Sequence, residues 1–493
     1  MKFGSQLFFT TAGKAVQQIG IFALSVVLAR YFSKDEYGNY LHVQLVVNIC
    51  TWAFLFGIPH SVYYFLPNTR EKRSYVFQTY LVILVIALVC AVGLALCNGL
   101  ISQLLSNPNL PRYLIFISLL AFFQIPATIF EPMLISANRV GTFVKVDFFF
   151  NLSFFFVVFV PVYLGKSLQT IFECLVVFYA VQFSFISLSL FRLAMSFSNS
   201  RKEEDGKTFT LLQQFQYALP IGASQGMFEL AAYNDKIIIS NYFNPAQYAE
   251  YTRGTMPIPF VNTVQNALDN LLMRQFIQLF NEQNIRGLLA LWHNAIKMVA
   301  LFLYPTMVFF VLVGNMLIPA LFSESYKESG IIFQIYTCVL VFRVSTYNVI
   351  VRVIGKTGIL IWITLFSVVS NVVATISFVK MFGMEGAPLS TVLTSGLLAG
   401  AYILAIRKYL NVSGAEVFPW GALIRILFHS LISAIPSWFM LHELHIETWT
   451  LMTLSGVVYL ITYWVQVKWL PVIPMEDRNK IREVLPPRFG WIV

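Results

Sequence analysis

One apolar stretch of the chain carries polar side chains every four residues, a spacing that places them on one face of a helix. The series and its neighbours are Asn262, Gln265, Asn266, Asp269, Asn270 and Arg274. Side-chain amides hydrogen-bond to hydroxyl groups, and a guanidinium binds phosphate or carboxylate groups through several donors. The series therefore predicts a surface for a hydroxylated or anionic ligand. The alternative is hydrogen bonding between neighbouring helices.

Other polar and basic groups interrupt apolar stretches elsewhere in the chain. Lys14, Gln17 and Gln18 follow the spacing i, i+3, i+4, so they share one helix face. Lys297 lies near the cytoplasmic end of one predicted span and Arg343 near the middle of the next. These five residues are further candidates for binding an anionic or hydroxylated ligand, and structural hydrogen bonding between helices is again the alternative.

The composition indicates what kind of chain presents these groups. Hydrophobic residues make up 58% of the 493 residues and charged residues only 11%, whereas a typical soluble domain has about 25% charged residues. This composition excludes a soluble enzyme, a disordered chain and a fibrous repeat. It predicts an all-α polytopic membrane protein. Because a polar helix face against lipid is very unfavourable, the polar series must face protein or water.

Apolar runs of roughly 20 residues, the length that crosses a bilayer, predict about 14 transmembrane helices. The first run carries Lys14, Gln17 and Gln18, which a signal peptide would not have, so it is expected to be a retained span. The predicted spans are 8–30, 41–66, 76–98, 113–136, 143–164, 170–191, 216–240, 255–280, 289–313, 331–353, 359–380, 387–406, 422–441 and 449–467.

The distribution of basic residues predicts an orientation. With the N-terminus inside the cell, 20 of the 33 Lys and Arg residues lie in cytoplasmic loops and span edges, and seven lie outside. Cytoplasmic loops are enriched in Lys and Arg, so both termini are expected in the cytoplasm. Much of the net charge of +10 is therefore explained by topology. Six basic residues remain within the spans: Lys14, Lys236, Arg274, Lys297, Arg343 and Arg425.

Two segments 211 residues apart are similar, namely RYFSKDEYGNY at 30–40 and NYFNPAQYAEY at 241–251. Each follows an apolar span, the first and the seventh. A repeat that restarts at the seventh span predicts two six-helix lobes in a pseudo-twofold parallel repeat, plus two C-terminal helices. Chance similarity among abundant aromatic residues is the alternative. The expected organisation is an N-terminal lobe at 1–195, a cytoplasmic linker at 196–213, a C-terminal lobe at 214–408, two extra helices at 409–468 and a cytoplasmic tail at 469–493.

Several motifs resemble one family of membrane proteins. They are YFSKDEYGNY between the first two spans, Asp235 followed by IIISNYFNPAQYAEY, GKTGILIWITLFSVVSNVV at 355–373 and GMEGAPLSTVLT at 383–394. In this order they resemble the oligosaccharide-lipid flippase branch of the multidrug/oligosaccharidyl-lipid/polysaccharide exporter superfamily. That branch includes O-antigen flippases and is related to the lipid II flippase. The resemblance covers about residues 1–410.

The resemblance implies a function. A flippase of this branch moves a polyprenyl-diphosphate-linked oligosaccharide from the cytoplasmic to the outer leaflet of the bacterial inner membrane by alternating access, for surface polysaccharide synthesis. Glycosyltransferases and a polysaccharide polymerase are the partners it implies. In such a protein the candidate residues above would line a polar cavity, with Arg274 as a diphosphate ligand. Glu229 and Asp235, in the seventh span, would couple transport to an ion; a structural ion pair is the alternative.

Other functions are weighed against this one. An ion-coupled drug or metabolite exporter of the same superfamily shares the fold, and the sequence separates it poorly. A membrane glycosyltransferase or polymerase needs a large extracytoplasmic loop, and the longest predicted outer loop has about 17 residues at 314–330. No phosphate-binding Gly-x-x-x-x-Gly-Lys-Ser/Thr motif and no metal-ligand spacing occur. The sequence therefore predicts neither catalysis, nor a cofactor or metal, nor nucleic-acid binding.

Overall fold

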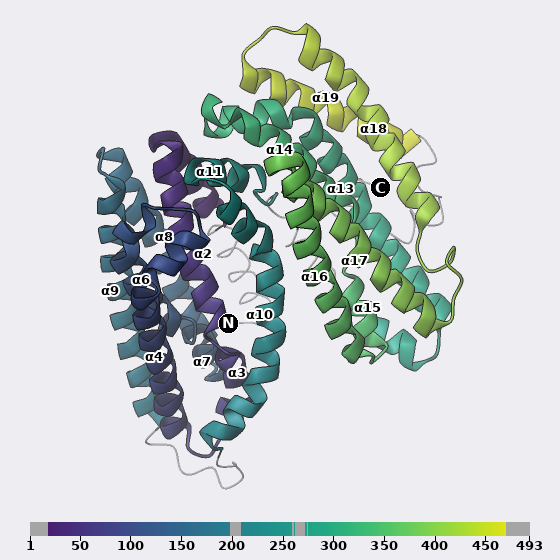
Figure 1. Cartoon of the computed structure of the whole chain (residues 1–493). Helices are drawn as coiled ribbons and strands as arrows, with labels where there is room; N and C mark the ends of the chain where they lie inside the picture. Colours follow the sequence, from purple (N-terminus) through teal and green to yellow (C-terminus); the bar gives the residue numbers. More distant parts are fainter. Residues whose placement is uncertain (1–17, 198–208, 259–260, 262–271, 274, 470–493) are drawn as a thin grey trace. The chain divides into compact units, whose positions relative to one another are not determined.

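Figure 1 shows a computed structural model, which describes residues 18–197, 209–258, 261, 272–273 and 275–469. Every element in these ranges is an α-helix or a short 3-10 helix, which confirms the all-α class. Within them, nine helical stretches are long and apolar enough to cross a membrane, and Gln18–Tyr31 forms a shorter apolar helix. One of these stretches, Gly358–Leu410, contains two helices joined by a 3-10 turn. The protein is a multi-pass membrane protein, and the count of 14 transmembrane helices stays a prediction.

The chain divides into two compact units, Met1–Ala249 and Glu250–Val493. The cytoplasmic linker at 196–213, expected between the two lobes, stays a prediction. In packing, α10 belongs to the first unit, because it lies against α2 and α3. The helices of the first unit are α2 (Lys34–Ala53), α3 (Ile58–Asn68), α4 (Lys72–Leu96), α5 (Asn98–Leu104), η1 (Leu110–Tyr113), α6 (Leu114–Ala127), α7 (Phe130–Ser136), α8 (Val140–Tyr163), α9 (Leu168–Ser196) and α10 (Leu211–Tyr242).

The unit boundary falls within α11 (Pro245–Gly254). The second unit is built around a long helix, α13, which packs against α14, α18 and α19. Buried apolar side chains of α13, α15, α17 and α18 form its main core. Its helices are α13 (Ile285–Phe322), η3 (Glu324–Tyr326), α14 (Lys327–Thr337), η4 (Cys338–Val341), α15 (Tyr347–Val353), α16 (Thr357–Phe382), η5 (Gly383–Glu385), α17 (Gly386–Leu410), α18 (Trp420–Glu443) and α19 (Thr448–Trp469).

Three predicted spans differ from the structure because they are interrupted. The spans at 41–66, 113–136 and 331–353 each consist of two or more helices rather than one. In the first, Phe56 and Gly57 adopt positive φ angles of 47° and 72°, which ends α2 and begins α3 in a new direction. Non-helical backbone within a membrane is tolerated only where it is buried in protein or lines a polar cavity. The interruptions are therefore positions at which to look for function.

The two repeated segments meet inside the first unit. Gly38 of α2 lies so close to Pro245, at the start of α11, that a Cβ atom would collide with the Pro245 carbonyl. One turn further along α2, the His42 ring stacks on the Tyr248 ring with centroids 4.3 Å apart. The sequence similarity therefore marks two segments that pack on each other.

His42 is the centre of a buried polar network beside this contact. Its side chain is fully buried; Nδ1 lies 2.9 Å from Asn107 Nδ2 and Nε2 lies 2.7 Å from Ser240 Oγ. The Asn107 amide also donates to Asn39 Oδ1 at 2.8 Å. Since an amide nitrogen can only donate, His42 Nδ1 accepts and Nε2 carries the proton. The network joins α2 to the C-terminal end of α10 and to the loop after α5.

Changing His42 to alanine is expected to destabilise the protein by about 2–3 kcal/mol, because two buried hydrogen bonds and a ring contact are lost. A loss of that size lowers the melting temperature of a unit this large by about 5–10 °C. Thermal unfolding of the purified protein in detergent measures it. His60→Ala is the matched control, since His60 is exposed in the same unit. Equal melting temperatures for the two variants would contradict the role of the network.

Candidate functional site

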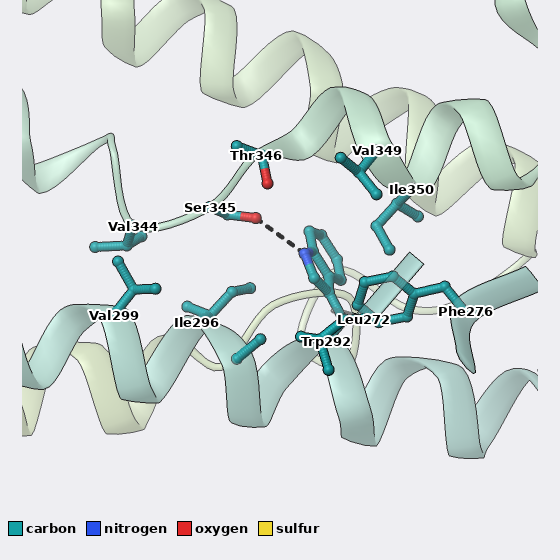
Figure 2. A pocket seen from close by; sticks show the side chains of 11 residues that line it. Leu272, Phe276, Trp292, Ile296, Val299, Val344, Ser345, Thr346, Val349 and Ile350 are labelled. Atoms are coloured by element: carbon teal, nitrogen blue, oxygen red, sulfur yellow. Dashed lines mark hydrogen bonds between the residues drawn. The ribbon is translucent and has the colours of Figure 1, made fainter. Parts of the chain in front are cut away.

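The interruption between η4 and α15 is held open by side chains. The carbonyl oxygens of Val341 and Phe342, which a continuous helix would pair, accept hydrogen bonds from the hydroxyls of Tyr304 at 3.3 Å and Tyr347 at 3.0 Å. Ser345 Oγ accepts from Trp292 Nε1 at 2.9 Å, as Figure 2 shows. Three hydrogen bonds from outside the interruption thus pair two of its carbonyl groups and one hydroxyl. The surrounding fold therefore stabilises the interruption.

Arg343 lies in this interruption. Its side chain is partly buried and lines a small cavity together with Pro257, Tyr336 and Leu340. A second cavity lies beside it, between Trp292 and Ile296 of α13 and Ser345 and Val349 (Figure 2). The two cavities have volumes of about 20 and 30 Å³, enough for a water molecule or two and too small for a sugar. Neither cavity can hold the head group of a large substrate, and ligand binding by Arg343 stays a prediction.

Lys297 lies on α13 and is only 9% exposed. An ammonium group this deep in the unit is expensive unless other groups solvate it. Two of the basic residues predicted to bind an anion are thus described in the second unit. Lys297 lies on α13, and Arg343 lies in the interruption after η4.

The two carboxylates predicted for ion coupling do not lie together. Glu229 and Asp235 are six residues apart on α10, which places them about 120° apart around the helix. Asp235 is 9% exposed, and its Oδ1 accepts a hydrogen bond from the Lys236 backbone N–H at 2.9 Å. Glu229 instead lines a groove of about 310 Å³ between the C-terminal end of α2 and α10.

The remaining predicted site residues add little to this geometry. Gln18 is exposed on the helix Gln18–Tyr31. In the described ranges, no three His, Cys, Asp or Glu side chains come together as a metal site requires. Eight predicted residues lie outside the described residues: Lys14, Gln17, Asn262, Gln265, Asn266, Asp269, Asn270 and Arg274.

A large apolar groove of about 550 Å³ runs between α13 and α19 in the second unit. Its lining includes Phe302, Phe309, Leu460 and Trp464 and contains no charged residue. Such a surface accommodates a hydrocarbon chain. This groove could not be predicted from the sequence, because the residues of each wall are typical of lipid-facing residues in a span.

Other lining residues were also missed. Trp52 of α2 and Phe56 of the following turn line the same groove as Glu229. Aromatic residues in an apolar run are too common to be recognised as site residues. The one available signal is the Gly57-Ile58-Pro59 sequence, which follows them and favours an interruption of the helix.

Comparison with solved structures identifies the fold. The lipid II flippase MurJ, in an inward closed conformation, matches with a TM-score of 0.70 and 14% identity, over 94% of this chain and 99% of that chain. An inward-facing multidrug resistance transporter of the MATE family, from the same superfamily, matches with a TM-score of 0.62 and 13% identity, over 80% of this chain and 95% of that chain. A superfamily transporter from Pyrococcus furiosus matches with a TM-score of 0.55 and 15% identity, over 81% of this chain and 93% of that chain. At these identities the matches establish a shared transporter fold.

The comparison with protein-family models gives the family directly. The comparison with curated proteins gives no match. The model described as polysaccharide biosynthesis protein matches residues 27–330, well over half of the 493 residues. The matched part contains the first unit from residue 27 onward, both repeated segments and α13. The chain therefore belongs to this polysaccharide biosynthesis protein family, and its fold is that of the superfamily which the sequence motifs resemble.

Proposed function

We propose that the protein is a flippase that carries a polyprenyl-diphosphate-linked oligosaccharide from the cytoplasmic to the outer leaflet of the bacterial inner membrane by alternating access. The observation that carries this proposal is the extent of the fold match. The match to the lipid II flippase covers 94% of the chain, and the match to the multidrug transporter covers 80%. The extra share is about the size of the C-terminal helix pair predicted at 409–468. The family, described by polysaccharide biosynthesis, supports the same substrate class.

The described residues suit the parts of such a substrate. Arg343 in its fixed interruption and Lys297 are suited to the diphosphate, because a guanidinium offers paired donors to phosphate oxygens. The apolar groove between α13 and α19 is suited to the isoprenoid tail, which stays in the bilayer while the head group crosses.

Transport is driven by an ion gradient and is one step of surface glycan synthesis. Glu229 and Asp235 are the candidates for ion coupling, as ionisable residues inside membrane segments often are. Both termini lie in the cytoplasm, glycosyltransferases supply the lipid-linked substrate on that side, and a polymerase consumes it outside. O-antigen or a related surface glycan is the product class.

The multidrug transporter match favours a second candidate, an ion-coupled exporter of drugs or metabolites. Reconstitution of the purified protein into liposomes distinguishes the two. The probes are fluorescent undecaprenyl diphosphate N-acetylglucosamine, whose movement between leaflets is followed by a membrane-impermeant quencher, and ethidium, whose uptake is followed under an imposed pH gradient. Movement of the lipid probe at least tenfold faster than in protein-free liposomes is expected. Ethidium transport without lipid movement would establish the second candidate instead.

A further inference from the structure

We propose that the groove between α2 and α10 binds a sugar ring of the transported oligosaccharide. The inference rests on the proposed function and names a subsite of it. One wall, called the α2 wall, consists of Trp52 on α2 and Phe56 in the turn that follows it. The α10 wall includes four residues at i, i+4, i+7 and i+11, a spacing that keeps them on one helix face: Gly222, Gly226, Glu229 and Tyr233.

The chemistry of these walls matches a pyranose. A sugar ring has faces of C–H groups, which pack on aromatic rings, and an edge of hydroxyls, which need polar partners. Trp52 is 40% exposed and Phe56 is 42% exposed, so ring surface is open on the α2 wall. Glu229 accepts hydrogen bonds from hydroxyls, and the Tyr233 hydroxyl both donates and accepts.

The Glu229 carboxylate distinguishes this groove from one that binds lipid. The groove between α13 and α19 has aromatic walls too, but no charged residue lines it. An acidic side chain facing acyl chains in the membrane is strongly unfavourable. Glu229 is therefore expected to face a polar occupant, and a hydroxylated ring between aromatic walls satisfies both kinds of wall at once.

The space itself is built by backbone features. Phe56 has a φ of 47°, a conformation that is strained for a side chain of this size. Gly222 allows this strained turn to pack on α10, because a Cβ there would meet the backbone of Phe56 and Gly57. At Gly226, by contrast, a Cβ would have no atom within 4 Å, so the groove is open above it.

Lys236 gives the site a direction. It lies seven residues after Glu229, on the same face of α10, and its Nζ is 5.3 Å from the centre of the Tyr233 ring. Seven residues of helix span about 10 Å, comparable to a sugar ring and the diphosphate joined to it. A sugar against Trp52 and Glu229 would therefore place its diphosphate near a cation.

Binding measurements on the full-length protein in lipid nanodiscs test the site. The probes are undecaprenyl diphosphate, bare or carrying one glucose, galactose or N-acetylglucosamine, and native mass spectrometry gives their relative affinities. The wild type is expected to bind at least one sugar-bearing lipid about fivefold to tenfold more tightly than the bare lipid, the size of an aromatic contact. Trp52→Ala should reduce this preference to less than twofold. Trp362→Ala, at a 71% exposed tryptophan of α16, should leave it unchanged.

A second pair of variants fills space instead of removing it. Gly226→Leu places a side chain in the open part of the groove, and the preference for sugar-bearing lipid should be lost. Gly93→Leu is the matched control, because a Cβ at Gly93 of α4 also has no atom within 4 Å. Leucine favours helix formation over glycine at both positions, so both variants are expected to fold. Glu229→Gln keeps a hydroxyl acceptor and should retain most of the preference.

The outcomes separate the subsite from the function. Failure to bind any of the four lipids would overturn the proposed function and the sugar site with it. Binding of all four with equal affinity by the wild type would leave the flippase proposal standing and overturn the sugar site. A sugar preference that persists in both Trp52→Ala and Gly226→Leu would also overturn this location.

Discussion

Changing Arg343 to alanine is expected to lower surface polysaccharide export more than tenfold. The guanidinium sits in an interruption whose backbone is held by Tyr304 and Tyr347 and whose Ser345 is held by Trp292. None of these three hydrogen bonds includes the Arg343 side chain, so all three can still form in Arg343→Ala. What is lost is a positioned cation with paired donors for a diphosphate. The measurement is glycan production in a strain that depends on this protein, with membrane protein levels quantified in parallel.

Two further variants make this result specific. Arg343→Lys keeps the charge but loses the paired donors, so partial activity is expected. Arg425→Ala is the control, because Arg425 is an exposed arginine whose Nε donates to the Gly421 carbonyl in its own helix. Full export by Arg343→Ala would contradict a cationic substrate site in the second unit. Arg274, outside the described residues, carries the same expectation from the sequence alone.

The positions of helices were largely predictable, because a lipid-exposed span is a continuous run of apolar residues. The span predicted at 359–380 corresponds to α16 at Thr357–Phe382 and the one at 422–441 to α18 at Trp420–Glu443. The interruption at 342–346 was not predictable in this way. The interruption exists because Tyr304, on another helix, and Tyr347 donate hydrogen bonds to carbonyl groups that would be paired in an uninterrupted helix. Such bonds cannot be predicted from the hydropathy of the sequence.

The candidate site was predictable only in part, for a related reason. Charged residues stand out in an apolar run, so Arg343, Lys297 and Glu229 could be identified from the sequence. Which of them share a surface depends on tertiary structure. Glu229 lies across a groove from Trp52 and Phe56, about 170 residues away in sequence. The two aromatic residues become part of a site because Gly222 allows the turn at Phe56 and Gly57 to pack on α10.

Changing Gly38 to alanine is expected to destabilise the protein by more than about 2 kcal/mol, although the change adds only one methyl group. Alanine favours a helix over glycine by about 1 kcal/mol, so any loss must come from packing. The added Cβ would collide with the Pro245 carbonyl group, which is backbone and cannot move aside as a flexible side chain can. Thermal unfolding in detergent and the yield of monodisperse protein measure the effect.

The matched control adds the same methyl group where there is room. A Cβ at Gly20, in the helix Gln18–Tyr31, has no atom within 4 Å, so Gly20→Ala should be neutral or slightly stabilising. An unchanged melting temperature for Gly38→Ala would show that the two repeated segments do not pack as closely as the structure has them. The comparison also bears on the repeat. At the offset of 211 residues, Gly38 corresponds to Ala249, which is fully buried and already carries a Cβ. Gly38→Ala would therefore make the two segments more alike in sequence. Its expected destabilisation would mean that the contact needs glycine in the first segment, although the second has alanine at the corresponding position.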